Sequence, residues 1–539
     1  MPETVFRYDV LNRLITVNYP TSQFNIIYRY DQGPNGISRL TQLNDNSGQT
    51  RYQYDERGNL LQQALTTQGT TYVTAYTYDN ADNLTQMTYP SGRIITMNRD
   101  ALGRIAQMAT SANGSNQTLI DNISYLPFGP IVGYSQGNGL TTTYSYDQDY
   151  RLSSQSTVNV LSQSYLYDAV NNITTITDSV SPANDQFFGY DNLDRLDTAQ
   201  GSYGDLAYSY DAVGNRQSES QDSQNTSYNY DANSQQLANL SGSDTANFGY
   251  DANGNLTSEN TDSYVYSDIN RLAQASSNGQ STDYRYNGRG ERTVKTNQSG
   301  TTVYHYDPSG LLIAETDASG ATLREYAYIN GQRLALIDNT GIYYIHSNHL
   351  DTPQVMTDQS QTIVWQANYT PFGEATITTA SIENNLRFPG QYFDQETGNH
   401  YNYFRDYDPS IGRYVQSDSI GLLGGVNTYA YVLNNPVRFI DPLGLATCQG
   451  EWRRIGFVRE PFAAITFRCV CNWSCFSCTG SGRGDAFPVP NPGQFRTEGT
   501  LSFDARNSGK GFDPEGGNQC LCAQPGPETG CHGNGCDNS

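Results

Sequence analysis

Two aspartates in the sequence have a spacing that could place their carboxyl groups together as a catalytic pair. Asp406 and Asp418 are twelve residues apart, and the turn around Gly412 could fold them against each other. Two carboxyl groups held close cannot both ionise, so one can activate a water molecule while the other protonates a leaving group. Arg405 could balance their charge or hold a carbonyl oxygen. The structural alternative stays open, because aspartate in Asp-Pro and Asp-Ser turns is needed only to accept backbone N–H groups.

A second candidate is a pair of histidines, His346 and His349, which could bind a metal ion. No third histidine or cysteine lies nearby in the sequence, and the segment has the pattern of a strand followed by a turn. The sequence therefore favours two structural histidines over a metal site.

The cysteines form the third candidate, and all nine lie in residues 446–539. Besides Cys448 they form two groups of four: Cys469, Cys471, Cys475 and Cys478, then Cys520, Cys522, Cys531 and Cys536. Eight cysteines could form four disulfides, or each group could bind one Zn²⁺ as thiolates. Only the Cys475/Cys478 pair has the usual knuckle spacing, and His532 could replace one ligand. Both alternatives stay open, and no enzyme signature is visible in this segment.

The composition divides the 539 residues at the same place. All 42 tyrosines lie in residues 1–445, and almost all of the net charge of −23 lies there too. Such an acidic body does not favour non-specific binding to nucleic acid, which needs cations to displace phosphate counterions. No apolar run approaches the ~20 residues that span a bilayer. The first residues have neither the basic start nor the apolar stretch of a secretory signal.

A repeat of about twenty residues positions these candidates. The unit is Tyr-x-Tyr-Asp, a Gly/Asn-rich turn and then Leu or Arg, with clear copies at residues 52–60 and 208–216. Tyrosines two apart leave the same face of a strand. The aspartate accepts N–H groups of the turn, and glycine or asparagine supplies the positive φ that tight hairpins need.

Each unit is therefore predicted to be one hairpin, which alone is marginally stable in water. Successive hairpins must stack, which predicts one continuous, extended all-β sheet. We interpret the regularly spaced tyrosines as packing between repeats, with their hydroxyls hydrogen-bonded along the sheet, rather than as a sugar-binding surface.

Residues 343–445 leave this rhythm and contain longer motifs. These are His-x-x-His-Leu-Asp-x-Pro at 346–353, Thr-Pro-Phe-Gly-Glu at 370–374, Arg-Phe-Pro-Gly-Gln-Tyr at 387–392, Tyr-Phe-Arg-Asp-Tyr-Asp-Pro at 403–409 and Asp-Pro-Leu-Gly-Leu at 441–445. Together with the Tyr-Asp units they resemble the YD-repeat, or Rhs (rearrangement hotspot), family over essentially all of residues 1–445. Residues 343–445 are similar to the repeat-associated core of that family, with Asp351 in place of the usual glycine.

The resemblance implies an all-β fold in three parts. Residues 1–342 would form a spiral β-shell, or cocoon, of stacked hairpins; residues 343–445 would close it; residues 446–539 would be a small, variable, cysteine-rich domain. The core of such shells is an intramolecular aspartic-type protease. It cuts just after Asp-Pro-x-Gly-Leu, here Asp441, Pro442, Gly444 and Leu445, so the cut would fall between Leu445 and Ala446.

The motifs also indicate which residues of this chain correspond to the protease residues of the family. Arg405 and Asp406 match the Arg-Asp pair of the family, and Asp418 matches the second acid. Ser419 stands where the family usually has proline, which is expected to loosen the turn that holds Asp418 and to slow the cut.

The function implied is a shell that encloses its own C-terminal effector or toxin, cuts it free and delivers it into a target cell. The shell itself needs no cofactor, whereas the tail could hold zinc. Expected partners are the tail as cargo, a second shell subunit as in insecticidal Tc complexes or a type VI secretion spike, and an immunity protein. Export would bypass the general secretory route, from the cytoplasm of the producer. The alternatives are an adhesive, carbohydrate-binding YD-repeat surface protein, or a truncated, inactive remnant of a longer Rhs protein.

Overall fold

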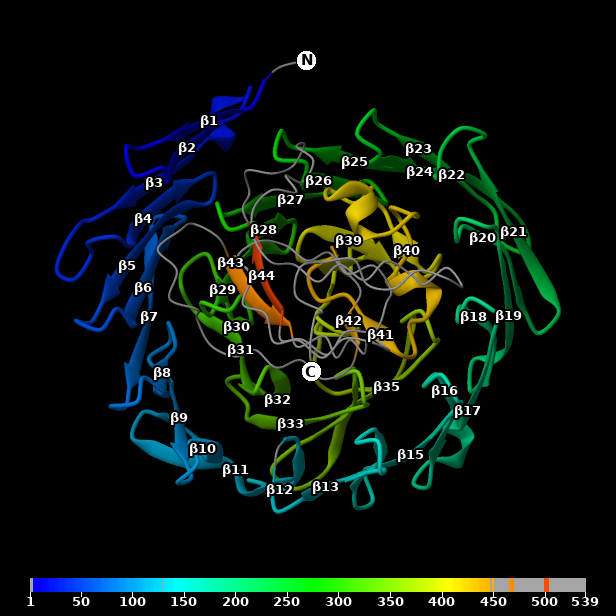
Figure 1. Cartoon of the computed structure of the whole chain (residues 1–539), viewed down its shortest axis with the longest axis horizontal. Coiled ribbons are helices and arrows are strands. Elements are labelled where there is room, and N and C mark those ends of the chain that lie inside the picture. Colours follow the sequence, from blue (N-terminus) through cyan, green and yellow to red (C-terminus); the bar gives the residue numbers. More distant parts are fainter. Residues whose placement is uncertain (1–2, 128, 446–447, 450–464, 470–498, 504–539) are drawn as a thin grey trace, which may run out of the picture.

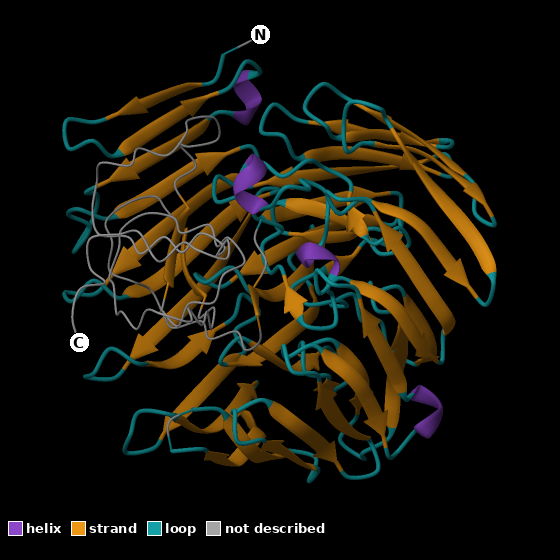
Figure 2. Ribbon diagram, turned by 45° about the vertical axis from the view of Figure 1, so that its right-hand side comes forward, coloured by secondary structure: helices purple, strands orange, loops and turns teal. Residues whose placement is uncertain are grey.

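The computed structural model describes residues 3–127, 129–445, 448–449, 465–469 and 499–503. This part is nearly all strand, with four short 3-10 helices (Figure 2). Thirty-six strands form one sheet in which each strand pairs antiparallel with the next, for example β5 with β6 and β35 with β36. The predicted continuous all-β sheet is therefore confirmed. Among the described residues, no helix is long and apolar enough to cross a membrane.

The first twenty-four strands are β1 (Val5–Tyr8), β2 (Leu14–Asn18), β3 (Ile26–Tyr30), β4 (Leu40–Asp45), β5 (Gly48–Tyr54), β6 (Leu60–Thr67), β7 (Thr70–Tyr78), β8 (Leu84–Thr88), β9 (Ile94–Arg99), β10 (Ile105–Ala112), β11 (Ser115–Tyr125), β12 (Ile131–Gln136), β13 (Thr141–Tyr146), β14 (Leu152–Thr157), β15 (Leu161–Tyr167), β16 (Ile173–Asp178), β17 (Gln186–Tyr190), β18 (Leu196–Gly201), β19 (Gly204–Tyr210), β20 (Arg216–Gln221), β21 (Gln224–Tyr230), β22 (Leu237–Gly242), β23 (Ala246–Tyr250) and β24 (Leu256–Glu259). The sheet continues with β25 (Asp262–Tyr266), β26 (Leu272–Ser277), β27 (Gln280–Tyr286), β28 (Arg292–Asn297), β29 (Gly300–Tyr306), β30 (Leu312–Asp317), β31 (Thr322–Ile329), β32 (Gln332–Ile337), β33 (Ile342–Ser347), β34 (Pro353–Thr357), β35 (Ile363–Tyr369) and β36 (Ala375–Ala380). The short strands after it are β37 (Tyr392–Phe393), β38 (His400–Asn402), β39 (Arg405–Asp408), β40 (Arg413–Tyr414), β41 (Phe439–Ile440), β42 (Cys448–Gln449), β43 (Ile465–Cys469) and β44 (Gly499–Phe503). The 3-10 helices are η1 (Ser22–Phe24), η2 (Pro182–Asn184), η3 (Gly421–Gly424) and η4 (Val432–Asn434).

We call the sheet from β1 to β36 the wall, and Figure 1 shows it winding inward as a spiral. The early strands run around the outside, and β28–β33 return inside them. Hydrogen bonds join the two turns: Tyr28 donates to the Gly288 carbonyl at 3.3 Å, and Tyr89 donates to the Tyr326 carbonyl at 2.7 Å. The partners are 260 and 237 residues apart, so one circuit takes about that length of chain. The predicted spiral shell is confirmed.

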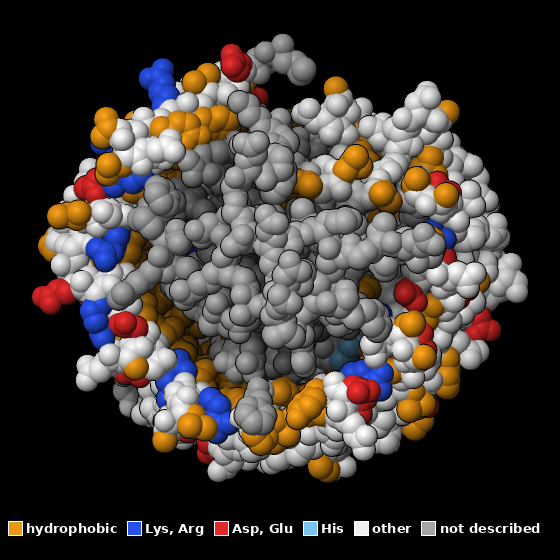
Figure 3. Space-filling model, viewed as in Figure 1, with side chains coloured by type: hydrophobic (Ala, Val, Ile, Leu, Met, Phe, Trp, Pro, Cys, Tyr) orange, Lys and Arg blue, Asp and Glu red, His pale blue; other side chains and the backbone are white. Residues whose placement is uncertain are grey.

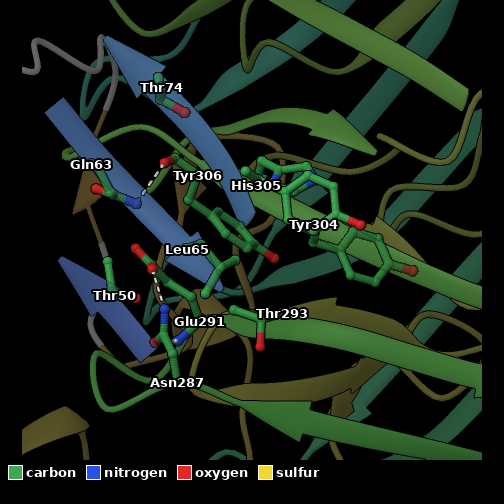
Figure 4. Close-up of a pocket in the computed structure, with 11 residues that line it drawn as sticks. Thr50, Gln63, Leu65, Thr74, Asn287, Glu291, Thr293, Tyr304, His305 and Tyr306 are labelled. Atoms are coloured by element: carbon green, nitrogen blue, oxygen red, sulfur yellow. Dashed lines mark hydrogen bonds between the residues drawn. The ribbon is translucent and has the colours of Figure 1, made fainter. Parts of the chain in front are cut away.

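A small polar pocket lies in the seam between the two turns (Figure 4). Strands β5–β7 of the outer turn and the β27–β29 region of the inner turn supply its lining. Gln63 reaches across to the Tyr306 carbonyl at 3.4 Å, and Asn287 donates to the buried carboxylate of Glu291 at 2.7 Å. Of these two bonds, the one from Gln63 crosses the seam, and the Asn287–Glu291 bond lies within the inner turn.

The two tyrosines of each repeat unit pack and hydrogen-bond between neighbouring repeats. In Tyr-x-Tyr the first ring is buried, as in Tyr52 and Tyr208. The hydroxyl of the second donates to a carbonyl of the preceding repeat, as Tyr210 does to Leu196 at 2.8 Å. The same bond is made by Tyr30, Tyr54, Tyr125, Tyr146, Tyr167, Tyr190, Tyr230, Tyr306 and Tyr328. The prediction of hydroxyls bonded along the sheet is confirmed.

The aspartate that follows closes each turn. Asp211 accepts the N–H groups of Val213 and Asn215 at 3.0 and 2.8 Å, and Gly214 has a φ of +85°. Where the residue four positions on is arginine, as in Arg195, its guanidinium pairs with the turn aspartate and lies over the tyrosine ring of the next repeat. The predicted turn chemistry is confirmed.

Residues 381–445, here called the inner domain, follow β36 and lie inside the ring (Figure 1). The predicted boundary at residue 342/343 falls within β33, and the wall continues to Ala380. The inner domain has its own four-stranded sheet, β37–β40. It rests on the turns of the wall: Asn435 bonds to Asn172, and Asn427 bonds to Asn215. In the space-filling view, acidic and basic side chains are interspersed around the visible rim (Figure 3).

Candidate autoproteolytic site

Strand β39 of the inner domain positions Arg405 and Asp406. It pairs with β38 through Asn402↔Arg405 and Tyr401↔Asp406. Neighbouring residues of a strand point to opposite faces, so the two side chains leave β39 in different directions. Both are buried. The Arg-Asp pair therefore serves two separate environments.

The guanidinium of Arg405 is the centre of the first environment. Its Nε donates to the Gly444 carbonyl at 2.5 Å, and its Nη1 donates to the Thr428 carbonyl at 3.0 Å. Its Nη2 lies 3.0 Å from Asp418 Oδ2 and 3.3 Å from Asp441 Oδ2. Such charge-assisted bonds are stronger than neutral ones. A single cation thus joins two buried carboxylates to the end of the Asp-Pro-Leu-Gly-Leu motif.

The motif itself is folded into a fixed turn. Asp441 accepts the N–H of Leu445 at 2.9 Å on Oδ1 and the hydroxyl of Tyr414 at 2.8 Å on Oδ2. Its backbone carbonyl accepts the side-chain amide of Asn402 at 2.8 Å. Gly444 has a φ of +69°, and a side-chain carbon there would lie 2.6 Å from the Asn402 carbonyl oxygen. Glycine is therefore required on both counts.

Burial controls the protonation of Asp418. Its carboxylate accepts the N–H of Ile420 at 3.0 Å, and its side chain is 3% exposed. Burial raises its pKa to about 7; the charge of Arg405 acts in the opposite direction, and Asp441 adds to the rise. At neutral pH this carboxyl group is therefore present in both its acid and its base form. The turn after Asp418 closes with Ser419 in it, because the N–H of Gly421 donates to the Asp418 carbonyl at 3.0 Å.

Asp406 lies in the second environment, against Gln416. The amide of Gln416 donates to Asp406 Oδ2 at 2.6 Å, and its oxygen accepts the Asp406 N–H at 2.6 Å. Burial raises the pKa of Asp406 to about 6, against the opposing effect of the Gln416 bond. No hydrogen bond or ion pair among the described residues joins Asp406 to Asp418. The acid that shares a cation with Asp418 is Asp441.

The structure therefore brings Arg405, Asp418, Asp441 and Gly444 together, whereas Asp406 leaves the other face of β39 and contacts Gln416. The sequence singled out Asp441 as part of the cut motif but not as a carboxylate of the site. It also missed Asn402 and Tyr414, which hold the motif. Their only signal is their position on either side of the motif at residues 403–409, since their contacts to Asp441 span 39 and 27 residues.

The two histidines have structural contacts. His346 Nε2 lies 2.9 Å from the Thr357 hydroxyl, and His349 Nε2 lies 2.7 Å from the Val437 carbonyl. Burial lowers their pKa to about 3 and about 4, so both rings are neutral. Within residues 3–127 and 129–445, no group of three or more His, Cys, Asp or Glu side chains is arranged to hold a metal ion. These contacts support the structural interpretation.

The cysteine predictions lie outside the described side chains. Cys448 and Cys469 fall in the strands β42 and β43, of which only the backbone is described. The other seven cysteines, and Ala446 on the far side of the predicted cut, lie outside the described residues. Zinc and disulfides both remain predictions.

Family models match successive parts of the chain. The model described as RHS Repeat matches residues 64–94 and 78–116, Teneurin YD-shell matches residues 214–341, and RHS protein matches residues 342–378. Double-stranded DNA deaminase toxin A of Burkholderia cenocepacia is 46% identical over 110 residues, which are 20% of this chain and 8% of that protein. Toxin protein Tse5 of Pseudomonas aeruginosa is 39% identical over 104 residues, which are 19% of this chain and 8% of that protein. The chain thus spans less than a tenth of these two relatives.

The fold also has a solved counterpart. The crystal structure of TcdB2-TccC3 superposes with a TM-score of 0.70 over 82% of this chain and 27% of that chain, at 20% identity. At this identity the likeness concerns the fold, which is the same spiral β-shell architecture. With the family models, the Tyr-Asp turns and the motifs of residues 343–445, it leads to one assignment: the chain belongs to the YD-repeat, or Rhs, family.

Proposed function

We propose that this protein is a β-shell that encloses its own C-terminal segment and cuts it free by hydrolysing the bond between Leu445 and Ala446. One observation carries the proposal. The Asp441–Leu445 turn is bound by Arg405, and the same guanidinium holds the carboxyl group of Asp418 at 3.0 Å. A buried acid that titrates near neutral pH is thereby kept beside the end of the motif.

The chemistry is acid–base hydrolysis. The carboxylate of Asp418 takes a proton from a water molecule, whose oxygen bonds to the carbonyl carbon of Leu445. The C–N bond to Ala446 then breaks, and the proton passes to the departing nitrogen, which leaves as an amine. Leu445 becomes the new C-terminal carboxylate. Arg405 holds the motif and balances the negative charge, and a pKa near 7 suits Asp418 to both proton transfers. Asp406 enters the proposal as the second acid through the family motif.

The cargo is proposed to be a toxic effector in residues 446–539. Two relatives are named as toxins, and one of them as a deaminase of double-stranded DNA. We extend only the class of toxin to this chain, with the activity of the tail left open. Delivery would use a non-Sec route out of the producing cytoplasm, with a second shell subunit or a secretion spike as carrier and an immunity protein in the producer.

The test of the cut is mass spectrometry of the purified chain. We expect a fragment that begins at Ala446, and we expect Asp418→Asn and Asp406→Asn chains to stay intact. Asp408→Asn is the matched control, because Asp408 is a buried acid of the same strand whose carboxylate caps its own turn through Ser410. An uncut wild-type chain, or a cut that survives Asp418→Asn, would refute the proposal.

The enclosure is tested by limited proteolysis of the intact particle after size-exclusion chromatography. A tail inside the shell resists protease although its sequence is rich in glycine and proline, whereas rapid digestion of the tail would rule enclosure out. Expression of residues 446–539 in bacterial cytosol, with growth and zinc content measured, then tests the effector. Normal growth with well-expressed tail argues against a cytosolic toxin.

A further inference from the structure

Gly424, which belongs to none of the family motifs named above, lies next to both the Asp418 carboxylate and the carbonyl of Leu445, the two groups that the proposed cut requires. Helix η3 follows Asp418 and ends at Gly424, which returns against the Asp418 carboxylate. A side-chain carbon built on Gly424 would collide with Asp418 Oδ2 and would lie 3.0 Å from the carbonyl oxygen of Leu445. The position that a side-chain carbon of residue 424 would occupy is therefore within contact range of both the Asp418 carboxylate and the carbonyl of the proposed scissile bond.

Neither of these groups is free to move aside. Asp418 Oδ2 is held by Arg405 at 3.0 Å. The backbone of Leu445 is held at its N–H, which donates to Asp441 at 2.9 Å, and the residue is 2% exposed. A side chain at position 424 could be accommodated only by displacing one of them.

The requirement for glycine at this position is spatial. Gly421, Gly425 and Gly444 have φ values of +60°, +137° and +69°, in the region that favours glycine. Gly424 is not among the glycines with positive φ, so its backbone suits any L-residue. Alanine at 424 would change the space between Asp418 and Leu445 without straining the backbone.

We infer that Gly424 is a positioning residue of the self-cleavage reaction: its missing side chain keeps open the space in which the Asp418 carboxyl group and a water molecule reach the carbonyl of Leu445. The inference rests on the proposed function and names a residue that the Arg-Asp pair, the second acid and the cut motif do not include. Gly424 does not itself touch a proton in the reaction. It acts through Asp418 and Leu445.

The test compares Gly424→Ala with Leu423→Ala in the full chain. Leu423 is the neighbouring residue and is 55% exposed, so its truncation leaves the site unchanged. We expect alanine at 424 to lower the cutting rate roughly 100-fold, the cost of a misplacement of about 1 Å in a reacting geometry. Leu423→Ala should cut at the wild-type rate. Rates are measured on the protease-resistant, folded fraction, so that a misfolded population is not counted as lost activity.

A second readout separates positioning from a general structural effect. The added methyl group displaces water from Asp418, which also faces Arg405 and Asp441, and so favours its neutral form. The residual cut of Gly424→Ala should therefore require a higher pH than the wild-type cut. A Gly424→Ala chain cut at the wild-type rate with an unchanged pH profile overturns this inference alone. A wild-type chain that is never cut overturns the proposed function and this inference with it.

Discussion

Replacing Asp418 by asparagine should stabilise the shell at pH 8 while removing the cut. Burial raises the pKa of this carboxyl group from its ordinary value of 3.8 to about 7. The folded protein therefore binds this proton more tightly than the unfolded chain does. As the pH rises from about 4 to about 7, the wild-type protein loses stability, because ionising the buried group costs more in the folded state. Asparagine imitates the neutral acid in size and shape and never ionises.

The magnitude follows from the two pKa values. A tenfold difference in proton affinity corresponds to about 1.4 kcal/mol. The full difference between 3.8 and about 7 is then about 4 kcal/mol at pH 8. This is a ceiling, since the amide also gives up the charged contact with Arg405, which keeps Asp441 as its partner. At pH 4 the same difference should fall below about 1 kcal/mol.

The assay is urea unfolding of wild-type and Asp418→Asn protein at pH 4 and pH 8. At each pH, the free energy of unfolding of the wild-type protein is subtracted from that of the Asp418→Asn protein. The quantity of interest is how much this difference changes between pH 4 and pH 8. Any effect of the cut on the free energy of unfolding that is the same at both pH values cancels in that comparison. A substitution that is equally stabilising at both pH values, or destabilising at pH 8, would show that Asp418 is not held at a raised pKa in the folded protein.

Three further outcomes are expected. The rate of the cut, followed by mass spectrometry after cell-free synthesis, should fall about tenfold for each pH unit below 7, because the carboxylate form of Asp418 is lost; a flat profile from pH 5 to 8 would exclude it as the base. Tyr210→Phe should cost about 1 kcal/mol in urea unfolding through its lost hydrogen bond, whereas Tyr150→Phe, at a residue that is 64% exposed, should cost close to nothing. Arg292→Met should cost about 3–5 kcal/mol in urea unfolding, because it leaves the buried carboxylate of Asp394 without its main partner; a loss below 1 kcal/mol would show that this pair does not lock the inner domain to the wall.

The wall was predictable because its determinants are local. Tyr-x-Tyr places two rings on one face, the aspartate closes the turn, and a glycine such as Gly214 supplies the positive φ, all within nine residues. The twenty-residue rhythm then dictates the next hairpin. The number of strands in one circuit of the spiral, before the inner turn contacts the outer turn, was not predictable in this way. That depends on the twist summed over many strands, and contacts such as Tyr89 to Tyr326 leave no periodic trace in the sequence.

The site was only partly predictable for a related reason. Arg405 and Asp406 are adjacent, which suggested one site, but the alternation of side chains along β39 sends them to opposite faces. The partner that Asp418 has instead, Asp441, comes from a segment without repeats. Its turn is tied to β39 by bonds that span 36 to 39 residues, a separation over which spacing predicts nothing.

The wall also takes part in building the candidate site, which links the shell to the self-cleavage proposed for it. The Thr428 carbonyl accepts both Arg405 Nη1 at 3.0 Å and the N–H of Asp418 at 2.9 Å, so this residue fixes the distance between cation and acid. Thr428 is held in turn by Gln235 of the wall, whose side-chain oxygen accepts the Thr428 N–H at 2.9 Å. Another wall residue, Arg271, donates to the Tyr403 carbonyl, two residues before Arg405. Since both wall residues lie more than 130 residues from their partners, the geometry of the site exists only after the inner domain has docked on the wall. A cut made by this site would therefore follow the closing of the shell around its cargo rather than precede it.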